Sequence, residues 1–211
     1  MSLTIVSKLA SQQGRNDEVP NIELAHELAK EEDREAIQDL IQLLSSKEKK
    51  IQNDCIKVVY EIGAVKPELI CEYAVVFIEL LRSRNNRLVW GSMSALATIA
   101  EVASETLMLH VDVLKSVMKT GSVITVDKGV LTLAKLAAVK EENNQIIFPF
   151  LLQHLETCRP KEIPQHAEST LIAVTEDNKE EFLHVLRLRE EYLSPPQLKR
   201  VKKVYKTVTS I

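Results

Sequence analysis

The sequence predicts an all-α fold built from about five pairs of helices and a single final helix. Three observations lead to this prediction: a unit of about 37 residues recurs along the chain, its apolar residues follow a helical spacing, and residues typical of β-sheets are scarce. One unit of this length cannot bury its apolar face alone, so its neighbours must stack against it and cover that face.

The repeat is visible in three segments that superimpose after a shift of 37 residues. They begin at Ile51, Leu88 and Thr125 and read IQNDCIKVVYEIGAVKPEL, LVWGSMSALATIAEVASET and TVDKGVLTLAKLAAVKEEN. The alignment places aliphatic residues in shared columns, which we expect to form the interior. These columns include Val59, Leu96 and Leu133, then Ile62, Ile99 and Leu136, and in the second half of each unit Leu40, Phe77, Leu114 and Leu151.

Each unit divides into two helices. Ile37, Leu40, Ile41 and Leu44 are spaced as i, i+3, i+4 and i+7, which is the stripe of an amphipathic helix. Proline at residues 195 and 196 is tolerated in the first turn of a helix and predicts where the final helix begins. We expect a single domain over residues 1–211, with repeats at residues 12–48, 49–85, 86–122, 123–159 and 160–194 and a terminal helix over residues 195–208.

The composition agrees with a helical interior and with a reduced environment. Aromatic residues make up 4% of the chain and glycine occurs five times, which argues against a β-sandwich or barrel. The three cysteines are widely spaced and form no CxxC pair, so we expect neither a disulfide framework nor a zinc site. No apolar run approaches the ~20 residues that span a bilayer, so the sequence predicts a soluble, cytoplasmic protein without membrane partners.

The first helices resemble the HEAT-repeat family, whose short form reads as an apolar pair, a small residue and then EIG. The segments CIKVVYEIGA, from Cys55, and SMSALATIAE, from Ser92, carry this pattern. The resemblance implies an armadillo-like solenoid, a right-handed superhelix of helix pairs whose second helices line the concave side. It also implies a scaffold, adaptor or recognition surface, although a fold does not fix a function.

A metal centre of the kind found in some HEAT-like proteins is not expected. Those proteins bind iron through adjacent His-Glu pairs repeated in several units, and here the one such pair is His26-Glu27. The columns of His110 and His154 otherwise hold mainly apolar residues, which suggests packing. The remaining histidines, His166 and His184, also lack a neighbouring glutamate. The sequence therefore predicts no metal and no cofactor.

An enzymatic alternative rests on Trp90 and Asp127. HEAT-like DNA glycosylases remove alkylated bases with aromatic residues and an aspartate, and these two residues occupy equivalent positions one repeat apart. Packed helices would separate them by roughly 8 to 10 Å. However, the chain has a single tryptophan, and the equivalent position of the preceding unit is Asn53. No nucleophile-elbow, P-loop or HExxH string is present. We therefore expect no enzyme activity, with the glycosylase kept as the alternative.

Charge is distributed unevenly along the chain. Residues 17–48 hold ten acidic and three basic residues, a net charge of −7, whereas residues 187–206 hold seven basic and two acidic residues, a net charge of +5. Charged end repeats solubilise a repeat stack. Alternatively, the basic end attracts an acidic partner such as nucleic acid. The candidate nucleic-acid contacts are Lys199, Arg200, Lys202 and Lys203, together with Trp90 and Asp127.

The second helices carry an apolar column outside their main stripe. Val76, Val113 and Phe150 align after the 37-residue shift, with Leu109 and Ile146 beside them. If these residues are exposed, they form an apolar surface of the kind that marks a partner site; the alternative is that neighbouring helices cover them. We predict a non-catalytic scaffold that holds a protein segment, such as an amphipathic helix, on this surface. Its acidic rim would be Glu72, Glu79 and Asp112.

Overall fold

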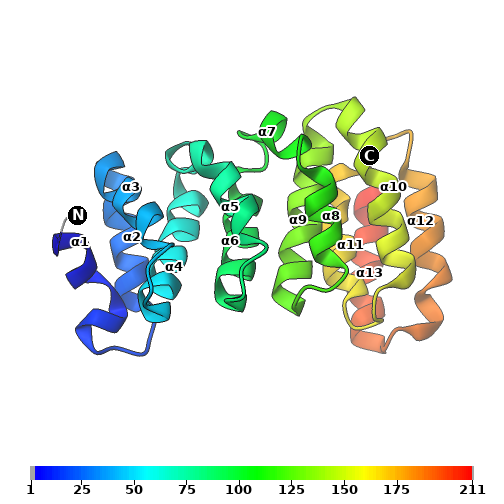
Figure 1. Cartoon of the computed structure of the whole chain (residues 1–211). Helices are drawn as coiled ribbons and strands as arrows, with labels where there is room; N and C mark the ends of the chain where they lie inside the picture. Colours follow the sequence, from blue (N-terminus) through cyan, green and yellow to red (C-terminus); the bar gives the residue numbers. More distant parts are fainter. Residues whose placement is uncertain (1–2, 211) are drawn as a thin grey trace. The chain divides into compact units, whose positions relative to one another are not determined.

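The computed structural model describes residues 3–210 and confirms the all-α fold class (Figure 1). Over that range the chain forms thirteen α-helices and five short 3-10 helices, without a strand. By its backbone contacts the chain divides into two compact units, Met1–Lys128 and Gly129–Ile211, and each is described by itself. The expectation of a single domain therefore stays a prediction. None of the described helices combines the length and the apolar content that a membrane crossing requires.

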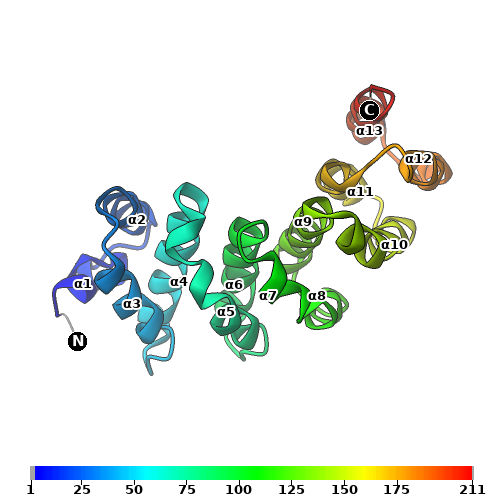
Figure 2. The same ribbon diagram turned by 90° about the horizontal axis from the view of Figure 1, so that it is seen from above.

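The first unit consists of two rows of helices (Figure 2). Helices α2, α4 and α6 pack side by side in a first layer, and α3, α5 and α8 form a second layer behind them. Helix α9 begins in this unit and crosses into the next. The bounds are α1 Leu3–Lys8, α2 Val19–Glu31, α3 Arg34–Leu43, α4 Lys49–Val65, α5 Ala74–Leu80, α6 Asn86–Ile99, α7 Ser104–Met108, α8 Val111–Met118 and α9 Val123–Val139.

The columns of the repeat lie in the interior, as the sequence predicts. Val59 and Leu96 in the first layer, and Phe77 and Leu114 in the second, have no exposed surface. Helices of the first layer approach closely at Gly91, because a Cβ atom placed there would lie only 2.6 Å from Cγ1 of Ile56. The small residue at this column therefore permits close contact between α4 and α6.

Polar side chains fix the amino-terminal segment on this layer. Asn21 is almost fully buried on α2, and its side-chain oxygen accepts a hydrogen bond from the backbone N–H of Ala10 at 3.0 Å. Asp54 of α4 accepts hydrogen bonds from the Asn21 side chain at 2.8 Å and from the backbone N–H of Ser11 at 2.9 Å. Buried polar groups are stable when they are paired in this way, so the network orders residues before the first helix pair.

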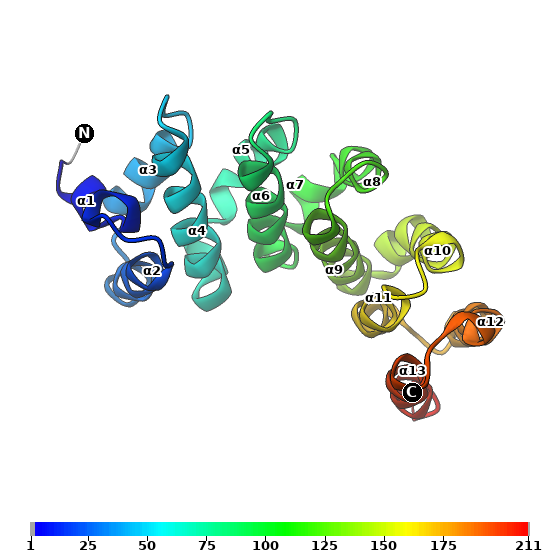
Figure 3. The same ribbon diagram turned by 90° about the horizontal axis from the view of Figure 1, so that it is seen from below.

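The second unit contains the end of α9 and four further helices (Figure 3). Helix α11 packs on α13 and α10 packs on α12. Helix α13 starts at Pro195-Pro196, and the Gln197 side chain accepts a hydrogen bond from the backbone N–H of Ser194 at 2.8 Å, which satisfies one of the free donors at a helix start. The bounds are α10 Glu141–Thr157, α11 Ile163–Thr170, α12 Lys179–Leu188 and α13 Pro195–Val208.

Candidate functional sites

The predicted apolar surface in the first unit consists of three side chains, which we call the second-layer strip: Val76, Leu109 and Val113. Val76 lies on α5, Val113 lies on α8, and Leu109 lies in the connection between α7 and α8. Leu109 is 83% exposed, whereas Val76 and Val113 are half-buried. Neighbouring helices thus cover part of the strip, and its most exposed member is a leucine.

The three carboxylates of the predicted acidic rim are exposed. Glu79 follows Val76 on α5, and Asp112 precedes Val113 on α8. Glu72 forms an ion pair with Arg34, with 3.1 Å between Nη1 and Oε1. Because both members of that pair are exposed, it contributes little to stability, and Glu72 is available to exchange partners.

Two further residues of the predicted surface belong to the second unit. Ile146 and Phe150 both lie on α10, where Ile146 is 52% exposed and Phe150 is half-buried. They occupy the repeat positions of Leu109 and Val113, so each unit carries its own part of the predicted column.

Trp90 of α6 packs against two side chains that the sequence analysis did not single out. The guanidinium carbon of Arg87 lies 4.2 Å from the centroid of the Trp90 rings, and the Tyr60 ring centroid lies 6.1 Å away. Arg87 occupies one face of the indole in a cation–π contact. Asp127, the predicted partner of Trp90, lies half-buried on α9.

Arg87 also belongs to a cluster of ion pairs in the first layer. Glu18 pairs with Arg87 and also with Lys57, whose Nζ lies 3.1 Å from Glu18 Oε2 and 2.5 Å from Glu61 Oε1. Lys57 is only 6% exposed. We call this group the first-layer cluster, and its members are Glu18, Lys57, Tyr60, Glu61, Arg87 and Trp90.

The contacts within the first-layer cluster favour the ionised forms of Lys57 and Glu18. Burial by itself lowers the pKa of Lys57, but hydrogen bonds to Glu61, Tyr60 and Glu18 raise that pKa above its ordinary value. Burial raises the pKa of Glu18, yet Arg87 and Lys57 together hold it below its ordinary value. General acid–base catalysis works best with a pKa near the working pH. Lys57 and Glu18 are therefore suited to a fixed ion network.

A sequence signal for this cluster exists, although it is weak. Lys57 and Glu61 are four residues apart on one helix, a spacing that favours ion pairs, and Arg87 lies one helical turn before Trp90. Glu18 comes from the preceding repeat, 69 residues from Arg87 in the chain. Only the packing of α2, α4 and α6 brings these side chains together.

The predicted basic residues of the second unit lie on α13. Lys199, Lys202 and Lys203 are exposed, whereas Arg200 forms an ion pair with Glu168 of α11, with 2.6 Å between Nη2 and Oε2. Lys206, also exposed, extends the set at i+7 from Lys199. These four lysines share one side of the helix. The opposite side buries Val201, Val204 and Val208.

Two histidines that the sequence does not place together, His154 and His166, lie next to each other in the second unit. His154 Nε2 and His166 Nδ1 lie 3.0 Å apart, and Cys158 lies beside both. His154 lies on α10, and Cys158, four residues later, directly follows that helix; this spacing is the sequence signal for the group. Sequence reasoning missed it because His166 comes from the next helix.

Comparisons with known proteins agree on the fold. No family model and no curated protein matches this sequence. Solved structures of designed or engineered proteins, among them the three below, match over nearly the whole chain. A computationally designed armadillo repeat protein for modular peptide recognition has a TM-score of 0.67 at 15% identity, covering 96% of this chain and 98% of its own.

The other two structures are equally similar in fold. A designed armadillo repeat protein in complex with the peptide (KR)4 has a TM-score of 0.65 at 14% identity, covering 97% of this chain and 89% of its own. An engineered protein has a TM-score of 0.64 at 19% identity, covering 98% of this chain and 96% of its own. Together with the helix pairs described above, these likenesses show that the chain has an armadillo-like helical repeat fold.

Proposed function

We propose that this protein is a non-catalytic scaffold that binds a peptide segment of a protein partner on the second-layer strip of its first unit. The observation that carries this proposal is Leu109, which is 83% exposed, whereas the other two members of the strip, Val76 and Val113, are half-buried. Burying one leucine side chain stabilises a complex by about 1.5–3 kcal/mol. A partner that covers Leu109 therefore gains more binding free energy than it would by covering a polar surface of the same area.

The acidic rim favours a partner with basic residues beside its apolar ones. Glu72, Glu79 and Asp112 are exposed and lie close in sequence to Val76 and Val113, and opposite charges around an apolar centre steer association and fix register. One structural neighbour is a designed armadillo repeat protein in complex with the peptide (KR)4, and another is a repeat protein designed for modular peptide recognition. We therefore commit to a peptide that presents leucine-like side chains on one side and lysine or arginine on the other.

The corresponding surface of α10 extends this proposal to the second unit. Ile146 and Phe150 offer the same kind of apolar contact. A peptide segment of the same chemistry would therefore bind to the second unit by itself through these two side chains.

The test uses a labelled helical peptide with leucine on one face and lysine on the others, alongside a scrambled peptide of the same composition. We expect the Leu109→Asp/Val113→Asp variant to bind the patterned peptide at least about tenfold more weakly, because a tenfold change needs only about 1.4 kcal/mol. Fluorescence anisotropy measures the dissociation constant.

Val65→Asp is the matched control, because Val65 is an exposed valine of α4 in the other layer. That variant should bind as the wild type does, and helical circular dichroism should be the same for all three proteins. Unchanged binding by the double variant, or equal binding of the scrambled peptide by the wild type, would refute the proposal.

A second candidate function, contact with nucleic acid, is favoured by the lysine side of α13. Lys199, Lys202, Lys203 and Lys206 are exposed on one side of the helix, and such an array neutralises phosphates irrespective of sequence. Trp90 and Asp127 belong to the other unit, and one indole face is already covered by Arg87. The nucleic-acid candidate therefore rests on the α13 lysines alone, which would contact phosphates and would not recognise bases.

Replacing these four lysines with glutamine tests the candidate. If α13 binds nucleic acid, the affinity of the wild type for duplex DNA should fall steeply with salt concentration. In the variant, the slope of the logarithm of the binding constant against the logarithm of the salt concentration should become shallower by about 0.9 for each phosphate contact removed. Filter binding across a salt series measures this slope. Lys47, Lys49 and Lys50, exposed near the start of α4, provide a control triple variant, whose slope should equal that of the wild type.

A further inference from the structure

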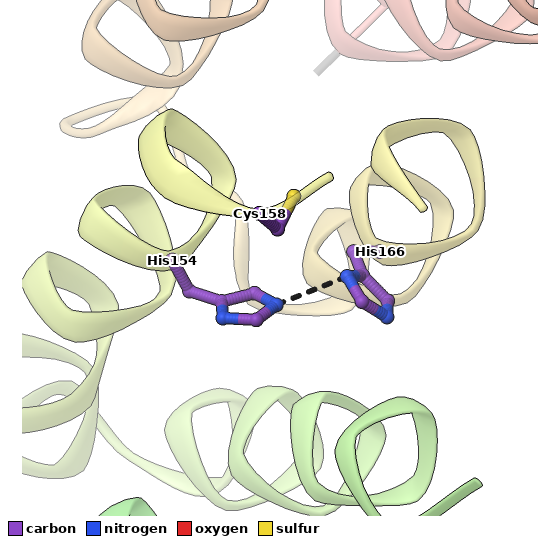
Figure 4. Close-up of side chains that lie close together, drawn as sticks. All are labelled: His154, Cys158 and His166. Carbon is purple, nitrogen blue, oxygen red and sulfur yellow. Dashed lines mark hydrogen bonds between the residues drawn. The ribbon is translucent and has the colours of Figure 1, made fainter. Parts of the chain in front are cut away.

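Three side chains with metal-ligand atoms converge in the second unit (Figure 4). His154 lies in the last turn of α10, Cys158 directly follows that helix, and His166 lies on α11. Their ligand atoms all lie within 4.8 Å of one another, and the two imidazole nitrogens are 3.0 Å apart. The group is thus compact enough for all three side chains to reach one ion.

The local fold explains why these residues meet. His154 and Cys158 are spaced i, i+4, so they lie on the same side at the end of α10. The short connection from Cys158 to Ile163 then returns the chain so that α11 packs on α10. Arg189 donates hydrogen bonds to the backbone carbonyl of Cys158 at 2.7 Å and to that of Leu155 at 3.3 Å. This guanidinium fixes the backbone that carries the thiol.

Burial gives the group one fixed side and one accessible side. His166 has no exposed surface, whereas His154 and Cys158 are half-buried. A buried imidazole is held in place by its packing, and the half-buried pair leaves a route by which an ion enters from solvent. Fixed ligands with an entry path are among the requirements for a metal site.

We propose that His154 Nε2, Cys158 Sγ and His166 Nδ1 bind a zinc-type divalent ion, with the fourth position open to water or to an external ligand. Zinc sites have Zn–N distances of about 2.0–2.1 Å and Zn–S distances near 2.3 Å, so tetrahedral ligand atoms lie roughly 3.3–3.6 Å apart. The separations in the structure, 3.0 Å between the nitrogens and at most 4.8 Å overall, bracket these values. Small side-chain rotations suffice to close the site.

The chemistry of the ligands selects the class of ion. Imidazole and thiolate suit zinc, cobalt and copper, whereas magnesium and calcium prefer oxygen ligands. Glu162 lies in the connection between Cys158 and α11, but its carboxylate accepts hydrogen bonds from the Arg159 guanidinium, at 3.0 Å from Nε, and is already engaged. Three protein ligands with an open position are typical of zinc sites that bind a substrate or activate water.

The competing explanation is a simple hydrogen bond between two neutral imidazoles. That pair needs one ring to donate and the other to accept, and it makes no use of the thiol. The two explanations therefore differ in what they predict for Cys158.

The experiment uses the full chain, treated with a chelator and then titrated with Co²⁺ as a spectroscopic probe and with Zn²⁺ in competition. We expect one Co²⁺ per chain, a thiolate-to-cobalt charge-transfer band in the near ultraviolet and intense visible bands of tetrahedral cobalt, all displaced by Zn²⁺. Cys158→Ser should remove the charge-transfer band and weaken metal binding at least about a hundredfold, beyond the 10–100-fold cost of losing an outer-shell partner.

Cys71→Ser is the matched control, since Cys71 is also a half-buried free cysteine but lies in the first unit. It should retain the full signal. His154→Gln provides a second ligand variant at a half-buried position, which avoids the packing cost of replacing buried His166. Absence of a charge-transfer band in the wild type, or equal loss in the Cys71 and Cys158 variants, would overturn the proposal.

Discussion

The Glu18→Ala/Glu61→Ala variant should unfold with about 3–5 kcal/mol less free energy than the wild type. Both substitutions leave Lys57, which is 6% exposed, without the carboxylates that lie 3.1 Å and 2.5 Å from its ammonium group. A buried charge that loses its partners costs this much, because the desolvation penalty remains while the attraction is gone. Deprotonation of Lys57 in the variant would reduce this penalty, and the free energy of unfolding would then depend more strongly on pH.

Urea denaturation followed by circular dichroism measures this loss. A triple variant that adds Lys57→Met is the control, since an apolar side chain of similar volume no longer needs the carboxylates. It should recover most of the lost stability. If the double variant is as stable as the wild type, Lys57 is solvated and the first-layer cluster does not stabilise the fold.

Phe77→Ala should destabilise the protein by about 3–5 kcal/mol, the usual cost of removing a large buried side chain and leaving a cavity. Phe77 is fully buried on α5 between the two layers. Its neighbour Val76 is half-buried on the same short helix, roughly 100° further round the helix axis, so Val76→Ala should cost well under half as much.

This pair of substitutions tests the assignment of faces directly, because the two residues are adjacent in sequence. Thermal and urea unfolding of both variants measure the difference. Equal losses would mean that Val76 is as fully covered as Phe77, and the second-layer strip would then have no free surface at Val76.

The interior could be predicted because its pattern is local and repeated. The spacing of Ile37, Leu40 and Leu44 identifies one buried side of a helix, and all three residues are almost fully buried in the structure. The shift of 37 residues then carries the same assignment to Phe77 and Leu114. Each of these inferences needs only the chain within one or two units.

The contacts of the polar side chains could not be predicted from the sequence in this way. Trp90 is the single tryptophan of the sequence and its contact with Arg87 lies within α6, but its contact with Tyr60 follows from the side-by-side packing of α4 and α6. A helical pattern says which side of a helix is buried and does not say how far its neighbour is shifted along the axis. That shift decides which polar side chains meet.

By itself, the sequence determined the all-α repeat architecture and the columns of its interior, because a helix with one apolar side has to be covered by the next unit. Only the tertiary structure decided that Lys57 lies between Glu18 and Glu61 and that His154, Cys158 and His166 converge. The physical reason is that burial depends on the periodicity within a helix, whereas a site depends on distances of a few ångströms between side chains of different helices.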